Sequence, residues 1–293
     1  MLLYAVPAYA LGKFKIAKPE HLPVLAAVLL YICTPAIIIN SFQKLEFSAD
    51  TVLKLGIYLL LAFLLQLVMM GGAWLITRKS DDKKNRIATI ATALGNCGFF
   101  GLPLLNALLP DNPEAVIYSA VFSIAMNTIA FTFGSLIISG DKKYIKAKKI
   151  FLNPAMIGAF IAIPLFIFGI KLPDFLSTAL GGCVSLSTPV CMFVLGIRLS
   201  AVKLSRIFTN VSAYLAIFAK QIIMPLLAVG ITLLLPFDPV LETAFVIISS
   251  CPVASVVLNL SELLGDGQNH AADCVLLGTI LSIVTIPIIS VFL

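Results

Sequence analysis

The sequence has 293 residues, of which 60% are hydrophobic and only 12% are charged, whereas soluble globular domains have roughly 45–50% apolar and about 25% charged residues. So few charges cannot cover the surface of a soluble fold of this length, which excludes a soluble enzyme, and so many apolar residues exclude a disordered chain. Because the apolar runs are continuous rather than alternating, we predict an all-α membrane protein rather than a β-barrel.

Charged or Pro/Gly-marked loops divide the chain into ten apolar segments, most of them near the ~20 residues that cross a bilayer core. They cover residues 1–12, 22–43, 52–77, 87–109, 114–139, 152–170, 173–197, 208–236, 239–264 and 269–293. The first segment rises only about 16 Å as a helix, and it lacks the basic start and cleavage site of a signal peptide. We therefore expect about ten transmembrane helices, the first of them short.

The positive charge of the chain is concentrated in alternate loops. Sixteen Lys and Arg residues lie in the loops around residues 13–18, 78–86, 142–149 and 198–206, against three in the intervening loops. Basic loops face the cytoplasm, so we predict a multi-pass plasma-membrane protein with an even number of spans and both termini outside. This distribution argues against nucleic acid as a partner despite the net charge of +6, although the same loops would suit anionic lipid.

An internal repeat relates the two halves of the chain. Thr34-Pro35 precedes Lys44-Leu45 at the same spacing that separates Thr188-Pro189 from Arg198-Leu199. Five spans per half is an odd number, so the halves would have opposite orientations, an architecture found in secondary transporters. We predict inverted repeats at 1–140 (spans 1–5) and 152–293 (spans 6–10), joined by a cytoplasmic linker at 141–151.

The fourth and ninth segments are each interrupted near the bilayer midplane. Gly95, Gly98, Gly101 and Pro103 interrupt the fourth at about 17 Å depth, and Cys251-Pro252 interrupts the ninth at roughly 18 Å. Because proline suits the first turn of a helix, we expect Pro103 and Pro252 to begin half-helices whose amino ends meet and attract an anion. Simple kinks or close packing are the alternative. The candidate substrate-binding residues here are Asn96, Cys97, Gly98, Pro103, Ser250, Cys251, Pro252 and Ser255.

Two polar residues within other spans complete the candidate site. Lys220 is the one ionisable residue plainly inside a span, and a charge at that depth is usually functional. It would offset a substrate anion or take the place of a coupling cation, unless it snorkels toward the cytoplasm. Asn127 would reach the same cavity or form an interhelical hydrogen bond.

Motifs of other protein classes are absent from the sequence. No Asp or Glu lies at mid-depth, as a sodium–proton exchanger needs, and there is no GxxxxGK[ST] for ATP and no HExxH or nucleophile motif. The six cysteines lie in apolar stretches and form no CxxC pair, so we interpret them as small packing residues. We expect no catalytic residues, no metal site and no cofactor.

The first interruption resembles a known family signature. The residues Gly95-Asn96-Cys97-Gly98-Phe99-Phe100-Gly101-Leu102-Pro103 resemble the Gly-Asn-x-Gly-Phe-x-Gly-x-Pro signature of the auxin efflux carrier family, and similar family patterns occur at Asn153-Pro154, Ser187-Thr188-Pro189, Met192–Gly196, Cys251-Pro252 and Leu281-Ser282. The resemblance covers almost the whole chain. It departs from the family in the short first helix, in the apolar residues that follow Cys251, and in a central loop shorter than that of many plant members.

This resemblance implies the fold shared with bile acid–sodium symporters and some sodium–proton antiporters. In that fold, a panel domain and a core domain with two crossing broken helices move relative to each other. The residues carried over are Asn96, Gly98, Pro103 and Pro252. Bacterial members of the family imply organic anions, such as malate or malonate, as substrates.

We therefore hypothesise a carrier of small organic anions, such as carboxylates or dicarboxylates, that works by alternating access. Coupling to protons, to sodium or to no ion stays open, and a homodimer is compatible with the hypothesis. The alternatives are a sodium-coupled symporter and a membrane sensor or scaffold that does not transport; an enzyme is the least favoured.

Overall fold

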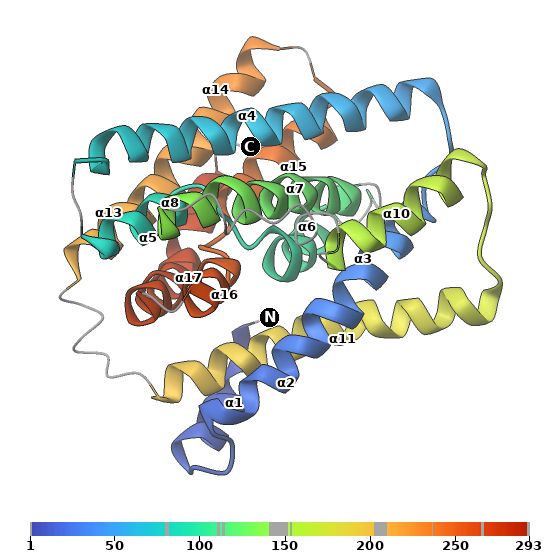
Figure 1. Cartoon of the computed structure of the whole chain (residues 1–293). Coiled ribbons are helices and arrows are strands. Elements are labelled where there is room, and N and C mark those ends of the chain that lie inside the picture. Colours follow the sequence, from blue (N-terminus) through green and yellow to red (C-terminus); the bar gives the residue numbers. More distant parts are fainter. Residues whose placement is uncertain are drawn as a thin grey trace. The chain divides into compact units, whose positions relative to one another are not determined.

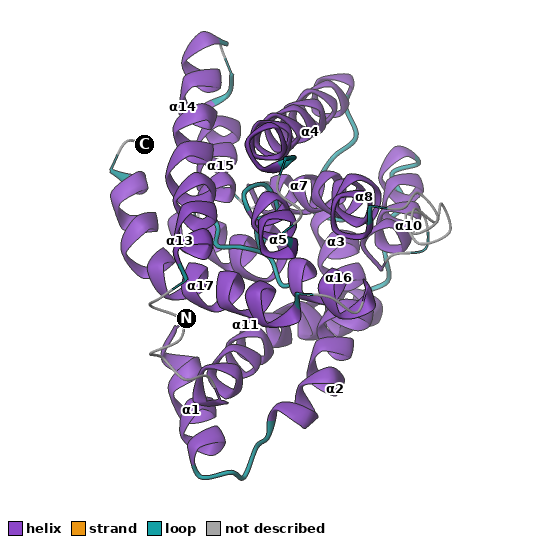
Figure 2. Cartoon of the chain, turned by 60° about the vertical axis from the view of Figure 1, so that its left-hand side comes forward, coloured by secondary structure: helices purple, strands orange, loops and turns teal. Residues whose placement is uncertain are grey.

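The computed structural model describes residues 2–79, 82–109, 112, 115–140, 152, 154–201, 210–235, 237–264 and 267–291. Regular structure within these ranges is helical apart from one isolated β-bridge between Gly95 and Val253, and Figure 2 shows helices and loops throughout them. Helices lie in all ten predicted segments. The predicted linker at 141–151 lies outside the described residues.

The chain divides into two compact units, each assembled from both halves of the sequence. The first unit comprises Met1–Val52 and Leu152–Arg206. Its described helices are η1 (Leu2–Tyr4), α1 (Ala5–Lys13), η2 (Pro19–His21), α2 (Leu22–Ala27), the π-helical turn η3 (Val28–Cys33), α3 (Thr34–Phe42), α10 (Pro154–Ile167) and α11 (Asp174–Ala201). As predicted, the first helix is short (Figure 1).

Small residues allow the helices of the first unit to approach each other closely. Gly12 of α1 faces Ser200 of α11, and Gly196 of α11 has no room for a Cβ, which would lie 2.9 Å from the Cβ of Ala8. Likewise, a Cβ on Gly158 of α10 would lie 2.9 Å from the Cα of Pro35 in α3. Helix pairs in membranes lack a hydrophobic driving force, and small residues let the backbones approach closely enough for van der Waals packing to stabilise the pair.

The second unit comprises Leu53–Phe151 and Ile207–Leu293 and contains both interrupted segments. Its first part holds most of α4 (Ala49–Thr77), then α5 (Lys83–Ala91), η4 (Cys97–Gly101), α6 (Leu102–Leu108), α7 (Ala115–Ile129), η5 (Ala130–Gly134) and α8 (Ser135–Ser139). Its second part holds α13 (Val211–Phe218), η7 (Ala219–Ile223), α14 (Met224–Leu234), α15 (Pro239–Ser250), α16 (Val256–Leu264) and α17 (Gln268–Ser290) (Figure 1).

Five helical stretches among the described residues are long and apolar enough to cross a membrane. They are 49–77, 117–139, 174–194, 211–234 and 268–290. Shorter apolar helices occupy 31–42, 156–167 and 239–250. By length and composition the chain is therefore a helical multi-pass membrane protein.

Prolines account for three of the π-helical turns. The turns η3, η4 and η7 each run directly into an α-helix whose second residue is proline, namely Pro35, Pro103 and Pro225. An interior proline has no N–H to donate and its ring clashes with the carbonyl four residues before it. A π-turn widens the helix at that point and accommodates the ring without ending the helix.

Candidate functional site

The two interrupted segments are built alike. Asp82 caps α5 by accepting from the Lys84 N–H at 2.9 Å, and Asp238 caps α15 by accepting from the Val240 N–H at 2.9 Å; both fix the start of a helix. After α5 ends at Ala91, residues 92–96 are not helical, and after α15 ends at Ser250, residues 251–255 are not helical. Each interruption is therefore five residues long.

The two interruptions cross and hydrogen-bond to each other. The Asn96 N–H donates to the Pro252 carbonyl at 2.7 Å, and the Ala254 N–H donates to the Leu94 carbonyl at 2.9 Å. These bonds flank the antiparallel bridge between Gly95 and Val253. Backbone N–H and C=O groups that lose their partners where a helix ends must find new ones in a buried site. Here each interrupted segment supplies these partners to the other. The predicted crossing is therefore present.

The prediction that Pro103 and Pro252 begin the two half-helices is wrong. The half-helix after the second interruption begins at Val256, four residues beyond Pro252. On the other side the helical run begins at Cys97, well before Pro103, which is the second residue of α6. The crossing needs extended backbone in both segments. A proline favours extended backbone in the residue before it, and Cys251, which precedes Pro252, has φ −56° and ψ 145°. Pro252 thus lies in the extended stretch and contributes its carbonyl.

Four helix ends meet at this crossing. The carbonyl ends of α5 and α15 lead into it, and the amide ends of η4 and α16 lead out of it. Each carbonyl end carries about half a negative charge, and each amide end about half a positive charge. The site thus has an electrostatic polarity that owes nothing to formally charged groups on these four helices.

The predicted site residues at the crossing differ in accessibility. Asn96, Gly98 and Ser255 are partly exposed, whereas Cys97, Ser250, Cys251 and Pro252 are buried. The buried side chains already have partners: the Cys97 Sγ lies 3.1 Å from the Ser123 Oγ, and the Ser250 hydroxyl donates to the Ile247 carbonyl at 2.7 Å. Of these residues, only Asn96, Gly98 and Ser255 therefore retain exposed surface.

The two site residues predicted on other helices have different positions. The Asn127 amide of α7 donates to the Ser123 carbonyl at 2.8 Å, one turn back on its own helix. Lys220 lies in the turn η7 with no exposed surface, and its Nζ donates to the Ser249 carbonyl of α15 at 2.6 Å. A Cβ on Gly95 would lie only 2.9 Å from this Nζ. Lys220 is therefore at the crossing and does not snorkel away from it.

Sequence reasoning missed three polar residues of this region. Ser119 of α7 donates its hydroxyl to the Cys97 carbonyl, and Ser123 contacts the Cys97 thiol. Tyr58 of α4 is fully buried against the rings of Tyr118 and Phe245, and its hydroxyl has no hydrogen-bond partner among the described residues. Serines and tyrosines in apolar helices are too common to mark a site, so no sequence signal identified them.

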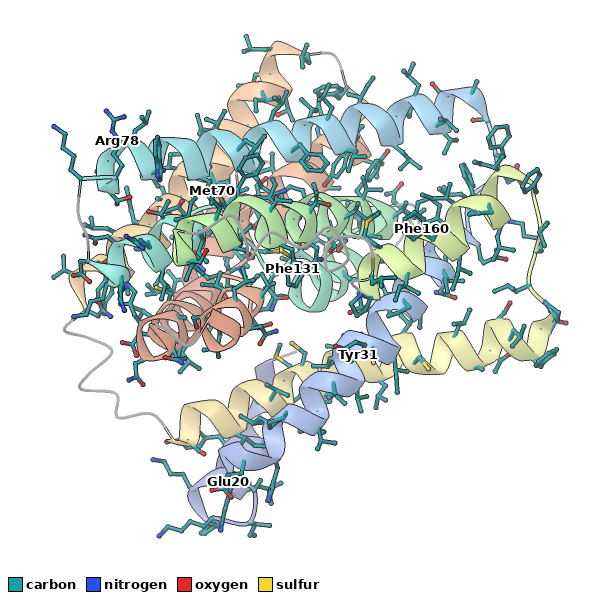
Figure 3. All side chains as sticks on the ribbon, viewed as in Figure 1. Glu20, Tyr31, Met70, Arg78, Phe131 and Phe160 are labelled. Carbon is teal, nitrogen blue, oxygen red and sulfur yellow. The ribbon has the colours of Figure 1, made fainter. Side chains whose placement is uncertain are left out.

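A separate cavity of the same unit is lined by none of the predicted site residues. It has a volume of about 520 Å³ and lies along α4, α5 and α8, beside Trp74, Arg78 and Arg86. In Figure 3, Met70 and Arg78, which both line it, are labelled at this end of α4. The Arg78 guanidinium stacks over the Trp74 ring at 5.7 Å from its centroid, a cation–π contact that holds the basic group at the cavity edge.

Comparison with known proteins agrees with this architecture. The family model described as "Membrane transport protein" matches residues 1–290. The chain belongs to this family. It is the auxin efflux carrier family that the Gly95–Pro103 motif predicted, and its members are transporters rather than enzymes.

Several curated relatives carry transporter descriptions. A protein described as an "uncharacterized transporter" of Methanothermobacter thermautotrophicus is 26% identical over 300 residues, covering 100% of this chain and 96% of its own length. A second such protein, from Methanocaldococcus jannaschii, is 26% identical, covering 98% of this chain and 95% of its own length. A protein of Rhizobium meliloti described as a "putative malonate transporter" is 24% identical over 220 residues, covering 72% of this chain and 68% of its own length.

Proposed function

We propose that this membrane transporter is a secondary carrier of small organic anions, which bind at the crossing of the two interrupted segments. The observation that carries the proposal is the crossing itself, where the two interruptions bond to each other, η4 and α16 begin with their amide ends, and the Lys220 ammonium is buried beside Gly95 and Ser249. The amide ends supply about one positive charge between them and the carbonyl ends of α5 and α15 about one negative charge, so the buried ammonium leaves a net charge of about +1 at the crossing. A carboxylate is the simplest solute that matches this charge and these donors.

The accessible residues of the crossing suit a carboxylate as well. The half-buried Asn96 has a side-chain amide that can donate hydrogen bonds, the half-buried Ser255 has a hydroxyl, and Gly98 leaves the backbone open to close approach. The Rhizobium meliloti relative is described as a transporter of malonate, a dicarboxylate. Together these features favour mono- or dicarboxylates over neutral or cationic solutes.

The membrane arrangement that we propose has ten spans in two inverted repeats, 1–140 and 152–293, with the basic loops in the cytoplasm. Three features of the chain support it. The interruptions have equal length, and both interrupted segments begin with an aspartate cap. In addition, the first compact unit takes the first two predicted spans of each half, and the second unit takes the other three. Alternating access would open the crossing to each side of the membrane in turn.

Flux measurements on purified protein test the function. The full chain is reconstituted into liposomes, and uptake of labelled malonate, malate and a monocarboxylate is compared with that of empty liposomes. The proposal expects saturable uptake of at least one of these anions. Inserted, folded protein that moves none of the anions overturns the carrier proposal, and binding without flux would indicate a sensor.

Two variants test the location of the site. Asn96→Ala keeps the main-chain bond to Pro252 but removes the side-chain amide, and Pro252→Ala relaxes the backbone at the second interruption. We expect each to reduce uptake at least tenfold while membrane insertion is unchanged. Asn259→Ala, which removes an exposed amide from α16, is the matched control and should transport normally. Wild-type uptake by both crossing variants would rule out the crossing as the site.

A further inference from the structure

Lys220 and Gln221 occupy the same π-turn, and both are fully buried. The Gln221 amide is neutral and has neutral partners: it donates to the Gly278 carbonyl at 2.6 Å and accepts from the Thr285 hydroxyl at 3.3 Å. Lys220 instead brings a cationic group into the unit, and burying an unbalanced charge in a membrane protein is costly. Something at the crossing must therefore balance it.

The ammonium is bonded to a backbone carbonyl at the end of a helix. Its Nζ donates at 2.6 Å to Ser249, whose carbonyl belongs to the last turn of α15 and so has no partner within that helix. The Cβ position of Gly95, 2.9 Å from Nζ, is 3.6 Å from the Cys251 carbonyl oxygen. The ammonium thus lies between the two interruptions, on the side where the carbonyl end of α15 points.

Glycine at position 95 is what makes room for this arrangement. A side chain there would place its Cβ 2.8 Å from the Lys220 Cε, closer than non-bonded carbon atoms approach. The backbone of Gly95 has an ordinary negative φ, so conformation does not require glycine here. The requirement is space for the lysine.

The charges at the crossing then balance in pairs. The carbonyl ends of α5 and α15 carry together about one negative charge, and the amide ends of η4 and α16 together about one positive charge. Without a cation these four ends sum to about zero, and the carbonyl ends would offset the attraction of the amide ends for an anion. One ammonium, bonded at the carbonyl end of α15, offsets the negative charge of the carbonyl ends and leaves the amide ends free to act on a substrate.

We propose that the Lys220 ammonium is the resident cation of the crossing, held where a coupling sodium ion would otherwise be needed, so that the carrier binds its anion without sodium. Half-helix carbonyl ends and unwound backbone are the groups that coordinate sodium in transporters with broken helices. Here a tethered cation already binds the carbonyl end of α15. The inference rests on the proposed function only for its consequence in flux, because occupancy by a cation can be measured on its own.

Thermal unfolding of the purified full chain tests the occupancy. Each protein is unfolded in sodium chloride and in choline chloride at equal ionic strength. The wild type should unfold at the same temperature in both salts. Lys220→Ala vacates the position, and sodium in about tenfold excess over its dissociation constant should raise its Tm by roughly 2–5 °C. Lys220→Met, which fills the space without a charge, and Gln221→Met, which removes the neighbouring buried amide, should show no sodium effect.

Uptake into liposomes tests the consequence for coupling. Wild-type uptake of the transported anion should be equal in sodium and choline. In choline, uptake by Lys220→Ala should be at least tenfold lower than that of the wild type, and it should recover at least in part when sodium is restored. The loss of a merely structural lysine would not be relieved by sodium. If Lys220→Ala does not fold, Lys220→Ser is used in both assays.

The outcomes separate the two proposals. A sodium-dependent Tm or sodium-dependent uptake of the wild type overturns the resident-cation inference, and so does a Lys220→Ala protein that transports fully in choline or gains no stability from sodium. If no anion is transported by any protein, the carrier proposal fails while the Tm comparison still decides the inference.

Discussion

Replacing Gly95 by alanine tests the packing of Lys220 directly. The new Cβ would lie 2.8 Å from the Lys220 Cε and 2.9 Å from its Nζ, and the next nearest atom is the Cys251 carbonyl oxygen at an ordinary 3.6 Å. Only the lysine therefore opposes an alanine at this position. Because Lys220 is fully buried and bonded to Ser249 at 2.6 Å, it can retreat only by giving up that bond.

The cost follows from the bond that is lost. A hydrogen bond to a charged group contributes about 1.5–3 kcal/mol, so Gly95→Ala should lower the free energy of unfolding by about that amount. In a Lys220→Ala background the obstacle is absent and the same substitution should cost little. The double-mutant cycle should therefore give a coupling energy of roughly 1.5–3 kcal/mol.

Unfolding of four purified proteins measures this coupling: wild type, the two single variants and the double variant. For a chain of this size the expected difference corresponds to roughly 3–10 °C in Tm. Gly98→Ala is the matched control in the same region, because its Cβ would be 3.5 Å from the Ser123 hydroxyl and should show no coupling to Lys220. Equal costs of Gly95→Ala with and without the lysine would refute the contact and the space argument built on it.

Three further substitutions probe the rest of the molecule, each by thermal unfolding. Tyr58→Phe removes a buried hydroxyl without a partner among the described residues and should leave Tm unchanged or raise it by about 2–4 °C; a marked fall would reveal a partner. Gly196→Ala should cost about 1–3 kcal/mol by forcing α1 away from α11, whereas Gly182→Ala on the same helix meets no atom within 4 Å and should be neutral or stabilising by up to about 1 kcal/mol. Equal effects would contradict the α1–α11 contact. Asn210→Ala removes the cap of α13 and a 2.8 Å contact to His270 and should cost about 1–3 kcal/mol; Asn210→Ser should recover part of it, and no loss in either variant would count against the cap.

The helical segments, and the presence of an interruption in the fourth and the ninth of them, were predictable from the sequence. A continuous apolar run in lipid must satisfy its own backbone groups, and the helix does so locally, so composition decides the outcome without knowledge of the neighbours. The cluster from Gly95 to Pro103 and the pair Cys251-Pro252 weaken a helix through their own backbone properties. These effects are local, and the second interruption lies where the sequence predicts it. The first includes only Gly95 of the predicted cluster, because the chain is helical again from Cys97 and so through Gly98, Gly101 and Pro103.

The partners across the crossing came only from the tertiary structure. Nothing in the spacing of Asn96 and Pro252, more than 150 residues apart, shows that one donates its N–H to the other. The same long-range pairing moved the start of the second half-helix to Val256, because a local preference of proline for a helix start yields to the extended backbone that the crossing requires.

Lys220 shows most clearly which properties the sequence sets and which depend on the tertiary structure. The sequence alone identified a cation inside an apolar segment, and hydropathy made it conspicuous. Whether it reached the membrane surface or the centre of the protein depended on the carbonyl end of α15 and on the space beside Gly95. Hydrophobicity and backbone propensity depend on residues near one another in the chain, so the sequence determines them. The partner of a buried charge is a group that the fold brings close from elsewhere in the chain, so only the tertiary structure decides which group that is.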